Sequence, residues 1–307
     1  MKRALVIGGG GFIGTNLVRR LKNEGWDVVA LDLHKPYFEE SAADEFIEND
    51  ARFYDFSKFK DFDRVYQLAA DMGGAGFVFT GNNDAEILSK SVAININLLN
   101  HLSDFKGKVF YSSSVCIYSP EVTQHKATEE DAYPASADSN YGWEKLYSER
   151  LYEAYHRNHG LDIRIARFNN TYGPHGVFEG GREKSPAAVC RKVLKANPVV
   201  EIWGDGKQIR EFVYIDDLLD AIEVLVNSDV KTPVNIGPDD FITIDGLVEL
   251  ARQVEDKQIE IKHVDGPIGL QTRLTNNDII KSLGWYPKVS LKEGITRTYQ
   301  WIKQQYE

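Results

Sequence analysis

The fold of this chain is decided close to its start by the stretch Ala4–Gly14, which reads ALVIGGGGFIG. Its first part, Ala4–Gly8, is a short apolar run typical of a buried strand, and Phe12–Glu24 has the pattern of a helix. Four consecutive glycines join the two, and glycine permits the tight turn that such a junction needs. The stretch therefore predicts a strand, a glycine turn and a helix in direct succession.

The spacing of these glycines predicts a ligand. Glycine recurs at every third position, so that the backbone can approach a pyrophosphate resting on the helix N-terminus. The residues expected to contact this dinucleotide are Gly8, Gly11, Phe12, Ile13 and Gly14. Asp32 ends the next predicted strand, where its carboxylate can bind both ribose hydroxyls and would repel a 2′-phosphate, so we expect NAD rather than NADP. Asp55 is expected either to reach the adenine amino group or to be an exposed loop acid.

Strands and helices then alternate through the first half of the chain. The further predicted strands are Asp27–Asp32, Arg64–Ala69, Lys108–Ser113 and Ile163–Phe168. Strands separated by helices imply parallel βαβ units, so the expected fold class is α/β, with a doubly wound parallel sheet of the Rossmann type. After Gly173-Pro174 this rhythm breaks. We expect a dinucleotide-binding domain over residues 1–173, a smaller C-terminal α/β lobe for the substrate over 174–307, and a segment near 208–230 that returns to the first domain.

Composition and charge narrow the class of protein. The 307 residues are 42% hydrophobic and 27% charged, which is ordinary for a globular protein. A formal net charge of −10, with no block of lysine and arginine, argues against nucleic acid as the main partner. Cys116 and Cys190 are too few for a disulfide framework and lack metal-site spacing, and no apolar run reaches the roughly 18 residues that span a membrane. We therefore expect a cytoplasmic protein with no metal and no membrane partner.

A second set of residues is suited to redox chemistry. Tyr141 and Lys145 are four positions apart, which places both side chains on one face of a predicted helix, Tyr141–His159. The ammonium group is expected to lower the pKa of the phenol, so that tyrosinate acts as a base at neutral pH, and Lys145 can also hold the nicotinamide ribose. Ser114, after the preceding strand, can hydrogen-bond the reacting oxygen. Together these three redox residues predict hydride transfer at a carbon that bears a hydroxyl group.

The glycine turn and the redox residues resemble those of the extended short-chain dehydrogenase/reductase family, whose members modify nucleotide sugars. Two further motifs carry the resemblance: Asn169–Pro174, which reads NNTYGP, and Arg210–Asp217, which reads REFVYIDD. It covers essentially the whole chain. It also implies a homodimer in which two helices of each subunit, Asp84–Leu102 and Tyr141–His159, form a four-helix bundle.

Three longer stretches are similar, within that family, to the GDP-mannose 3,5-epimerases. They are Leu68–Phe77 (LAADMGGAGF), Ser114–Tyr118 (SVCIY) and Gly180–Ala188 (GGREKSPAA). In that family a cysteine and the lysine of a Glu-Lys pair are the acid and base, and these fall on Cys116 and Lys184. Sugar 4,6-dehydratases have an Asp-Glu pair where this chain has Val115 and Cys116, and 4-epimerases have inert residues there.

The resemblance implies a complete reaction. NAD takes hydride from C4 of a GDP-sugar while Tyr141 accepts the hydroxyl proton. The resulting ketone acidifies the hydrogens on C3 and C5, and Cys116 and Lys184 move protons on and off these carbons. Hydride then returns to C4, so that NAD is not consumed.

The remaining site residues are also implied by the resemblance. Leu68 and Ala69 are expected at the cofactor. The residues expected to contact the GDP-sugar are Gly73, Gly74, Ser114, Cys116, Asn170, Glu183, Lys184, Ser185, Lys192, Gln208, Arg210 and Arg273. The chain departs from the plant-type pattern at Val115, at Ser185 and over residues 76–90. The departures leave open whether the sugar is a hexose or a heptose, and whether C3, C5 or both are inverted.

Two competing hypotheses remain at this point. The first is a 4-epimerase or C4 oxidoreductase acting on another GDP-sugar, such as a GDP-heptose. The second belongs to another class, a non-catalytic NAD-sensing protein on the same fold, which would have little reason to keep the three redox residues together. The GDP-mannose type of 3,5-epimerisation is the favoured hypothesis.

Overall fold

The glycine turn forms as predicted. In the computed structural model, which describes all 307 residues, strand β1 (Arg3–Ile7) leads through four glycines into helix α1 (Phe12–Asn23). Gly8 has a φ of +85°, and a Cβ atom there would lie 2.7 Å from the backbone nitrogen of Ala69. A Cβ atom on Gly14 would lie 1.9 Å from the carbonyl oxygen of Gly8. Glycine is therefore required at both positions for the turn, the helix and the neighbouring strand to approach so closely.

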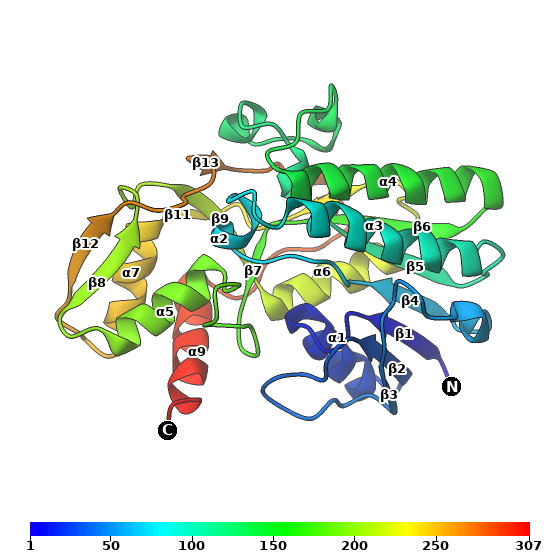
Figure 1. Cartoon of the computed structure of the whole chain (residues 1–307), viewed down its shortest axis with the longest axis horizontal. Coiled ribbons are helices and arrows are strands. Elements are labelled where there is room, and N and C mark those ends of the chain that lie inside the picture. The colour runs from blue at the N-terminus through cyan, green and yellow to red at the C-terminus, as the bar shows by residue number, and fades with distance from the viewer.

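A parallel sheet of seven strands forms the centre of the first lobe, in the order β10-β6-β5-β4-β1-β2-β3 (Figure 1). The strands that join β1 are β2 (Asp27–Asp32), β3 (Glu45–Glu48), β4 (Arg64–Gln67), β5 (Lys108–Ser114), β6 (Asp162–Phe168) and β10 (Val234–Ile236). The order reverses between β1 and β4, and ligands of such sheets bind beyond the carboxyl ends of the strands at that point. This arrangement confirms the doubly wound α/β fold predicted from the sequence.

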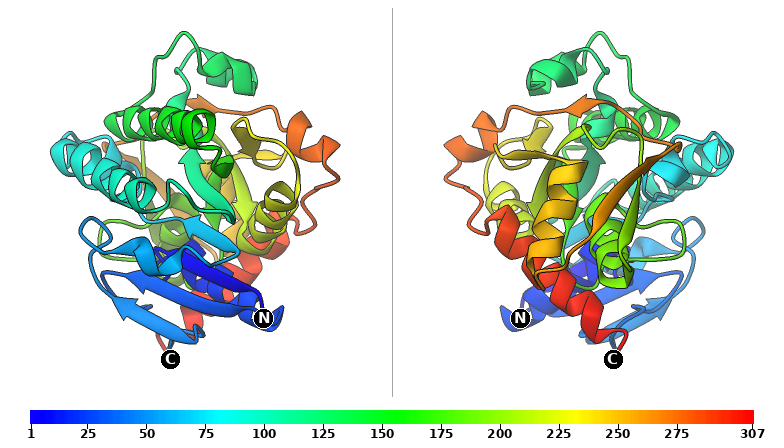
Figure 2. Two further views of the ribbon diagram at one scale, coloured as in Figure 1. Left: turned by 90° about the vertical axis from the view of Figure 1, so that its right-hand side faces the viewer. Right: turned by 90° about the vertical axis from the view of Figure 1, so that its left-hand side faces the viewer.

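Helices cover both faces of the large sheet, as Figure 1 and Figure 2 show. On one face lie α3 (Asp84–His101) and α4 (Asn140–His159), and on the other lie α1 and α6 (Ile215–Asn227). The strands are apolar on both sides for this reason. A core cluster of 19 buried residues fills the interface with α3 and α4, and one of 40 fills the interface with α1 and α6 and continues into the second lobe. Helix α4 starts at Ser139, whose hydroxyl accepts a hydrogen bond from the backbone N–H of Gly142, so the helix begins at a fixed point.

The second lobe is built from the C-terminal half of the chain and lies at the left in Figure 1. Its strands form a four-stranded sheet of β7, β9, β11 and β13 and a pair of β8 and β12. Their bounds are β7 (Asn170–Tyr172), β8 (Val199–Trp203), β9 (Ile209–Tyr214), β11 (Phe241–Thr243), β12 (Glu260–Val264) and β13 (Thr272–Arg273). The helices of this lobe are α5 (Ser185–Lys195), α7 (Ile244–Gln253) and α9 (Leu291–Gln304), and the short α8 (Asp278–Ser282) lies near β10.

The chain returns to the large sheet through α6 and β10, over residues 215–236. The sequence predicted such a return near 208–230, but β9, at the start of that range, belongs to the small sheet of the second lobe. The three residues of β10 pair with β6 at the edge of the large sheet. A strand this short has no periodic signal, so its position follows only from the long-range pairing. None of the helices is long and apolar enough to cross a membrane.

Candidate active site

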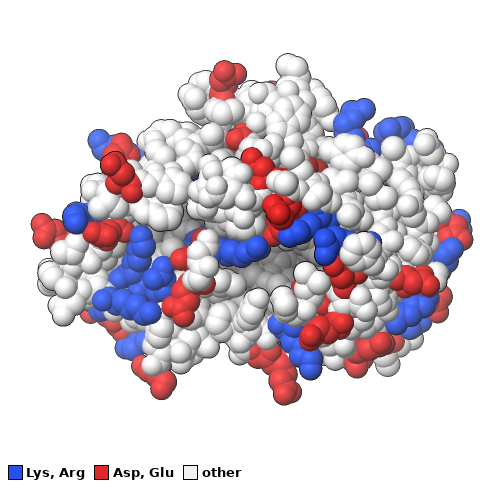
Figure 3. Space-filling view, viewed as in Figure 1, with Lys and Arg blue, Asp and Glu red and all other residues white.

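A pocket of about 350 Å³ opens between the two lobes, beyond the carboxyl ends of β5 and β6. Figure 3 shows this face of the molecule hollowed near its centre, with lysine and arginine side chains gathered along the hollow. The first lobe contributes the strand ends, the start of α4 and the segment that contains α2 (Ala75–Val78), while the second contributes α5 and β9. All twelve residues that the sequence predicts for substrate binding line this pocket.

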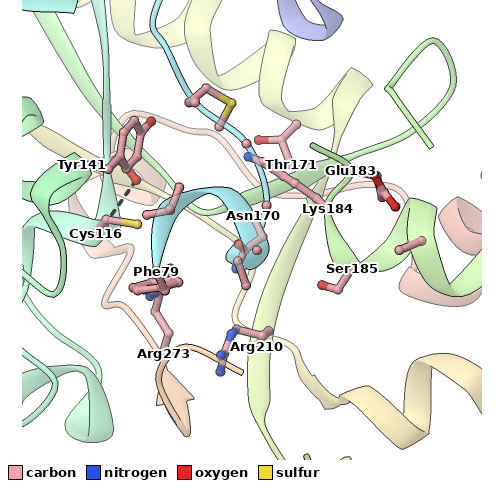
Figure 4. Close-up of a pocket in the computed structure, with 18 of the residues that line it drawn as sticks. Phe79, Cys116, Tyr141, Asn170, Thr171, Glu183, Lys184, Ser185, Arg210 and Arg273 are labelled. Carbon is pink, nitrogen blue, oxygen red and sulfur yellow. Dashed lines mark hydrogen bonds between the residues drawn. The ribbon is translucent and has the colours of Figure 1, made fainter. Parts of the chain in front are cut away.

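The three redox residues meet at the end of β5. Ser114 is the last residue of the strand, and its hydroxyl accepts a hydrogen bond of 3.2 Å from the backbone N–H of Cys116. This bond, drawn in Figure 4, starts the 3₁₀ turn η2 (Val115–Ile117). Tyr141 and Lys145 face the same space from the first turns of α4, and the Lys145 Nζ lies 5.6 Å from the centre of the Tyr141 ring. The structure thus brings together the residues that the sequence placed on one helical face.

The expected effect of Lys145 on Tyr141 is not found. Burial raises the pKa of the Tyr141 phenol well above its ordinary value, and the nearby groups Cys116 and Glu144 raise it further. Burial also lowers the pKa of Lys145, whose ammonium donates a 2.9 Å hydrogen bond to the carbonyl of Ser112. Loss of hydration is the largest cause of both shifts, because both groups are almost fully enclosed by protein.

Gly142 holds the start of α4 against η2. A Cβ atom at this position would lie 2.0 Å from the carbonyl oxygen of Cys116 and 2.7 Å from its carbonyl carbon. We expect Gly142→Ala to lower the free energy of unfolding by about 1–3 kcal/mol, as overpacking typically does, although alanine favours a helix. Urea denaturation measures this change. Gly76→Ala is the matched control, since the nearest atom to its Cβ is 3.7 Å away on Trp203, and its stability is expected to equal that of the wild type.

Two side chains that titrate face each other across the pocket. Cys116, in η2, is 8% exposed, and Lys184 stands at the N-terminus of α5 in the other lobe. Figure 4 shows Cys116 beside Tyr141 on one side and Lys184 entering from the opposite side. Burial raises the pKa of the Cys116 thiol and lowers the pKa of the Lys184 ammonium. Burial therefore shifts both groups towards their neutral forms.

The basic side chains predicted to contact the substrate differ in whether they already bond to other protein groups. Arg210 already donates to backbone carbonyls of the loop before β13, including those of Ile268 at 3.1 Å and Gln271 at 3.3 Å, so it fixes this wall of the pocket. Burial and the neighbouring Arg273 lower the pKa of Arg210 to about 10. Lys192 donates to the carbonyl of Glu201 at 2.8 Å. Arg273 keeps one buried donor, its Nε, without a partner.

Two more of the predicted contacts have protein partners of their own. The carboxylate of Glu183 accepts from Arg191 at 3.0 Å and from the backbone N–H of Gly181 at 2.7 Å. The amide nitrogen of Asn170 donates to the carbonyl of Glu211 at 3.2 Å. These bonds orient Glu183 and Asn170 at the pocket wall, and their roles toward a sugar stay predictions.

Several residues at the site were not predicted. Phe79, Trp203 and Ile268 add apolar surface to the pocket. The side chain of Asp138 lies buried next to Cys116. No motif contains Trp203 or Ile268, and Phe79 lies in the stretch that departs from the plant-type pattern. The signal for Asp138 was its place three residues before Tyr141.

The residues of the predicted dinucleotide site fit NAD. The N-terminus of α1 has no side-chain cap at Gly11, so its first backbone N–H groups remain available to a pyrophosphate. Asp32 accepts from the backbone of Gly10 at 3.0 Å and of Leu33 at 2.7 Å, which fixes its carboxylate at the end of β2. Asp55 is exposed and caps the 3₁₀ turn η1 (Phe56–Phe59), so the structure places it on a loop, and its contact with adenine stays a prediction.

The sequence comparison identifies the family. Residues 4–237 match the NAD dependent epimerase/dehydratase family. The chain belongs to this family. It is 41% identical over 314 residues to GDP-mannose 3,5-epimerase of Arabidopsis thaliana, and the alignment covers 98% of this chain and 82% of that protein. The resemblance carried by the three long motifs is thereby confirmed, and the protein is an epimerase with NAD as its cofactor.

Solved structures of the family share the whole fold. UDP-glucose 4-epimerase of Thermotoga maritima with UDP-glucose is 25% identical, with a TM-score of 0.89 and coverage of 99% of this chain and 100% of that one. UDP-glucuronic acid 4-epimerase of Bacillus cereus, in complex with UDP-glucuronic acid and NAD, is 26% identical, with a TM-score of 0.87 and the same coverage. Both lobes are therefore common to family members that bind nucleotide sugars.

Proposed function

We propose that the protein epimerises a GDP-sugar, with GDP-mannose as the first candidate, at C3 and C5 through transient oxidation at C4. The observation that carries this proposal is the placement of Cys116 and Lys184 on opposite sides of the pocket that holds Tyr141. Two proton-transfer groups at this place have no use in hydride transfer alone. They are suited to a substrate whose carbon atoms become acidic next to a ketone.

The chain's own groups can carry each proton step. When bound, NAD supplies the reversible exchange of hydride at C4. Tyr141 takes the proton of the C4 hydroxyl, and Ser114 bonds the same oxygen. The C4 ketone acidifies the neighbouring carbons, so that a neutral Lys184 amine removes a proton on its side of the ring. The Cys116 thiol donates a proton on the other side and inverts the centre. Lys184 is left as ammonium and Cys116 as thiolate, and both exchange protons with solvent before the next cycle.

The GDP moiety is proposed from similarity and from charge. Relatives at 40 and 41% identity are GDP-mannose 3,5-epimerases, and this chain aligns with them over at least 98% of its length. A diphosphate needs cationic partners, which Lys192, Arg210 and Arg273 provide on the second-lobe side of the pocket. Arg273 also offers a hydrogen-bond donor that is free, because its Nε is buried without a partner.

Turnover in deuterium oxide tests the reaction type. We expect GDP-mannose incubated with the NAD-loaded protein to gain deuterium at C3 and C5, because both carbons exchange protons with groups that equilibrate with solvent. Mass spectrometry and NMR of the recovered nucleotide sugars locate the label. A 4-epimerase or C4 oxidoreductase moves only hydride, so an inverted product without label at C3 or C5 would contradict the proposal.

The same measurement also shows which sugar is the substrate, which carbon is inverted, and whether the protein is a non-catalytic sensor. A panel that includes GDP-heptoses shows whether the departures of Val115, Ser185 and residues 76–90 alter the sugar. Label at one carbon alone assigns epimerisation to that carbon. A protein that binds NAD and leaves every nucleotide sugar of the panel unchanged would be the non-catalytic sensor.

We further propose a cytoplasmic homodimer that pairs through α3 and α4. Apolar side chains on these two helices are exposed, which supports a contact there: Leu88, Ile96, Trp143 and Tyr147. The two cysteines are free and buried, as a reducing compartment permits. For the domains, we propose that residues 1–173 with 215–236 bind NAD and that the rest of 174–307 binds the nucleotide sugar.

A further inference from the structure

A buried carboxylate lies beside Cys116 and has no part in the steps above. Asp138 directly precedes Ser139, the residue that caps α4. Its side chain has no exposed surface, and its Oδ1 accepts a 2.6 Å hydrogen bond from the Ser139 hydroxyl. Its backbone N–H donates to the carbonyl of Cys116 at 3.1 Å. The carboxylate is thus fixed to both the helix that carries Tyr141 and the turn that carries the thiol.

The second oxygen of Asp138 forms an ion pair with Arg273. The Arg273 side chain is 6% exposed, and its Nη2 donates to the Asp138 Oδ2. Arg273 comes from β13 in the second lobe, so this pair joins the two lobes directly behind the thiol. A buried ion pair is costly to form because both charges lose their hydration. Removal of one partner strongly destabilises the protein, since the other charge is left buried and unpaired. Because Asp138 holds one end of the guanidinium, the free Nε of Arg273 is also held in place.

The charge balance around the thiol depends on this pair. The titratable groups that act on Cys116 come from α4 and the loop before it, from α5, and from β9 and β13. They are Asp138, Tyr141, Lys145, Lys184, Arg210 and Arg273. Asp138 is the one carboxylate among them, and four of the others are basic, of which Lys184 is shifted by burial towards its neutral form. Asp138 raises the pKa of the thiol and Arg273 lowers it. Without the carboxylate, the basic groups would lower the pKa of the thiol against the effect of burial, which raises it.

We propose that Asp138 is a positioning residue for the epimerisation: it holds Arg273 behind Cys116 and cancels its charge, so that Cys116 remains a thiol able to give a proton to carbon. This inference rests on the proposed function of Cys116 as an acid. It assigns to Asp138 a task that neither hydride transfer nor binding of the diphosphate requires. It also explains why an ion pair, rather than two apolar residues, fills this buried position between the lobes.

The test is a titration of the thiol in the NAD-loaded protein. The rate of alkylation of Cys116 by iodoacetamide is followed against pH, with the modified peptide identified by mass spectrometry. We expect Asp138→Asn to lower the apparent thiol pKa by about 1–3 units and Arg273→Gln to raise it, since a charge within reach shifts a pKa by that amount. The double variant D138N/R273Q, in which a neutral pair replaces the ion pair, is expected to return to near the wild-type value. Asp138→Glu keeps the charge and is expected to stay near it as well.

Opposite shifts in the two single variants separate electrostatic positioning from a structural role, because misfolding moves both in the same direction. Asp71→Asn is the matched control, since it removes a carboxylate that lies between the pocket residues Ala70 and Met72 in the chain and pairs with Arg182 and Lys90 instead. Its thiol pKa is expected to equal that of the wild type. An unchanged thiol pKa in D138N, measured on protein with a wild-type circular dichroism spectrum, would overturn the proposal. If D138N does not fold, the comparison is between R273Q and the double variant, and equal thiol pKa values in these two would overturn it. The titration needs no turnover, so failure of this inference and failure of the proposed reaction can be told apart.

Discussion

Replacing Cys116 with serine is expected to slow inversion of the sugar by about 10²–10⁴-fold, the usual contribution of a positioned acid. A hydroxyl fills nearly the same space as a thiol but is a much weaker acid, so the introduced serine cannot return the proton on its side of the ring. C4 oxidation does not use this group and is expected to continue. Lys184 still removes and returns protons on its own side. The recovered GDP-mannose should therefore gain deuterium at C3 or C5 while its configuration stays unchanged.

The second cysteine supplies the control. Cys190 is fully buried in the core of the second lobe, on α5, and its thiol does not line the pocket. Cys190→Ala is expected to invert the sugar at the wild-type rate. If Cys116→Ser also formed the inverted product at an undiminished rate, Cys116 would have no part in proton transfer, and Lys184 with solvent would have to serve both faces.

The large sheet was predictable because its signals are local. Apolar runs such as those of β1 and β5 are buried on both faces. Helices with their own period, such as α1 and α4, separate the strands along the chain. The short strands of the second lobe were not predicted. Strands such as β7 and β13 have three and two residues, and only their pairing with β9 defines them. Pairing over long sequence distances leaves no periodic trace.

In the site, too, residues with a local sequence signal were predicted and residues brought in by long-range contacts were not. Residues within motifs, such as Ser114 and Lys184, were placed in the pocket from sequence because a motif records the local geometry. Trp203 reaches the site from a distant segment, which no spacing encodes. Asp138 is three residues before Tyr141, but its burial depends on the ion pair with Arg273 of the other lobe. The pKa of Tyr141 was expected in the wrong direction for a related reason: the degree of burial depends on packing by the whole pocket.

Tyr141→Phe is expected to slow C4 oxidation by about 10²–10⁴-fold, because the hydroxyl proton of the sugar then has no acceptor. Burial raises the pKa of this tyrosine, so tyrosinate is a minor form at neutral pH and its fraction grows as pH rises. In the wild type, the rate of C4 oxidation should therefore increase with pH through the neutral range, and this rise should vanish in the variant. Single-turnover formation of reduced cofactor, followed by its absorbance after mixing with GDP-mannose, measures both effects.

Tyr147→Phe is the matched control, since Tyr147 lies on the same helix but does not line the pocket, and phenylalanine keeps the ring that the proposed dimer contact uses. It should oxidise C4 at the wild-type rate.

Deuterium labelling shows whether C4 oxidation comes before proton transfer. Because Tyr141→Phe forms the ketone so slowly, C3 and C5 do not become acidic and the recovered sugar should carry almost no label. Cys116→Ser should carry label without inversion. If Tyr141→Phe took up as much label as the wild type, proton exchange at C3 and C5 would not need the ketone. Proton transfer by Cys116 and Lys184 would then not depend on C4 oxidation by the redox residues.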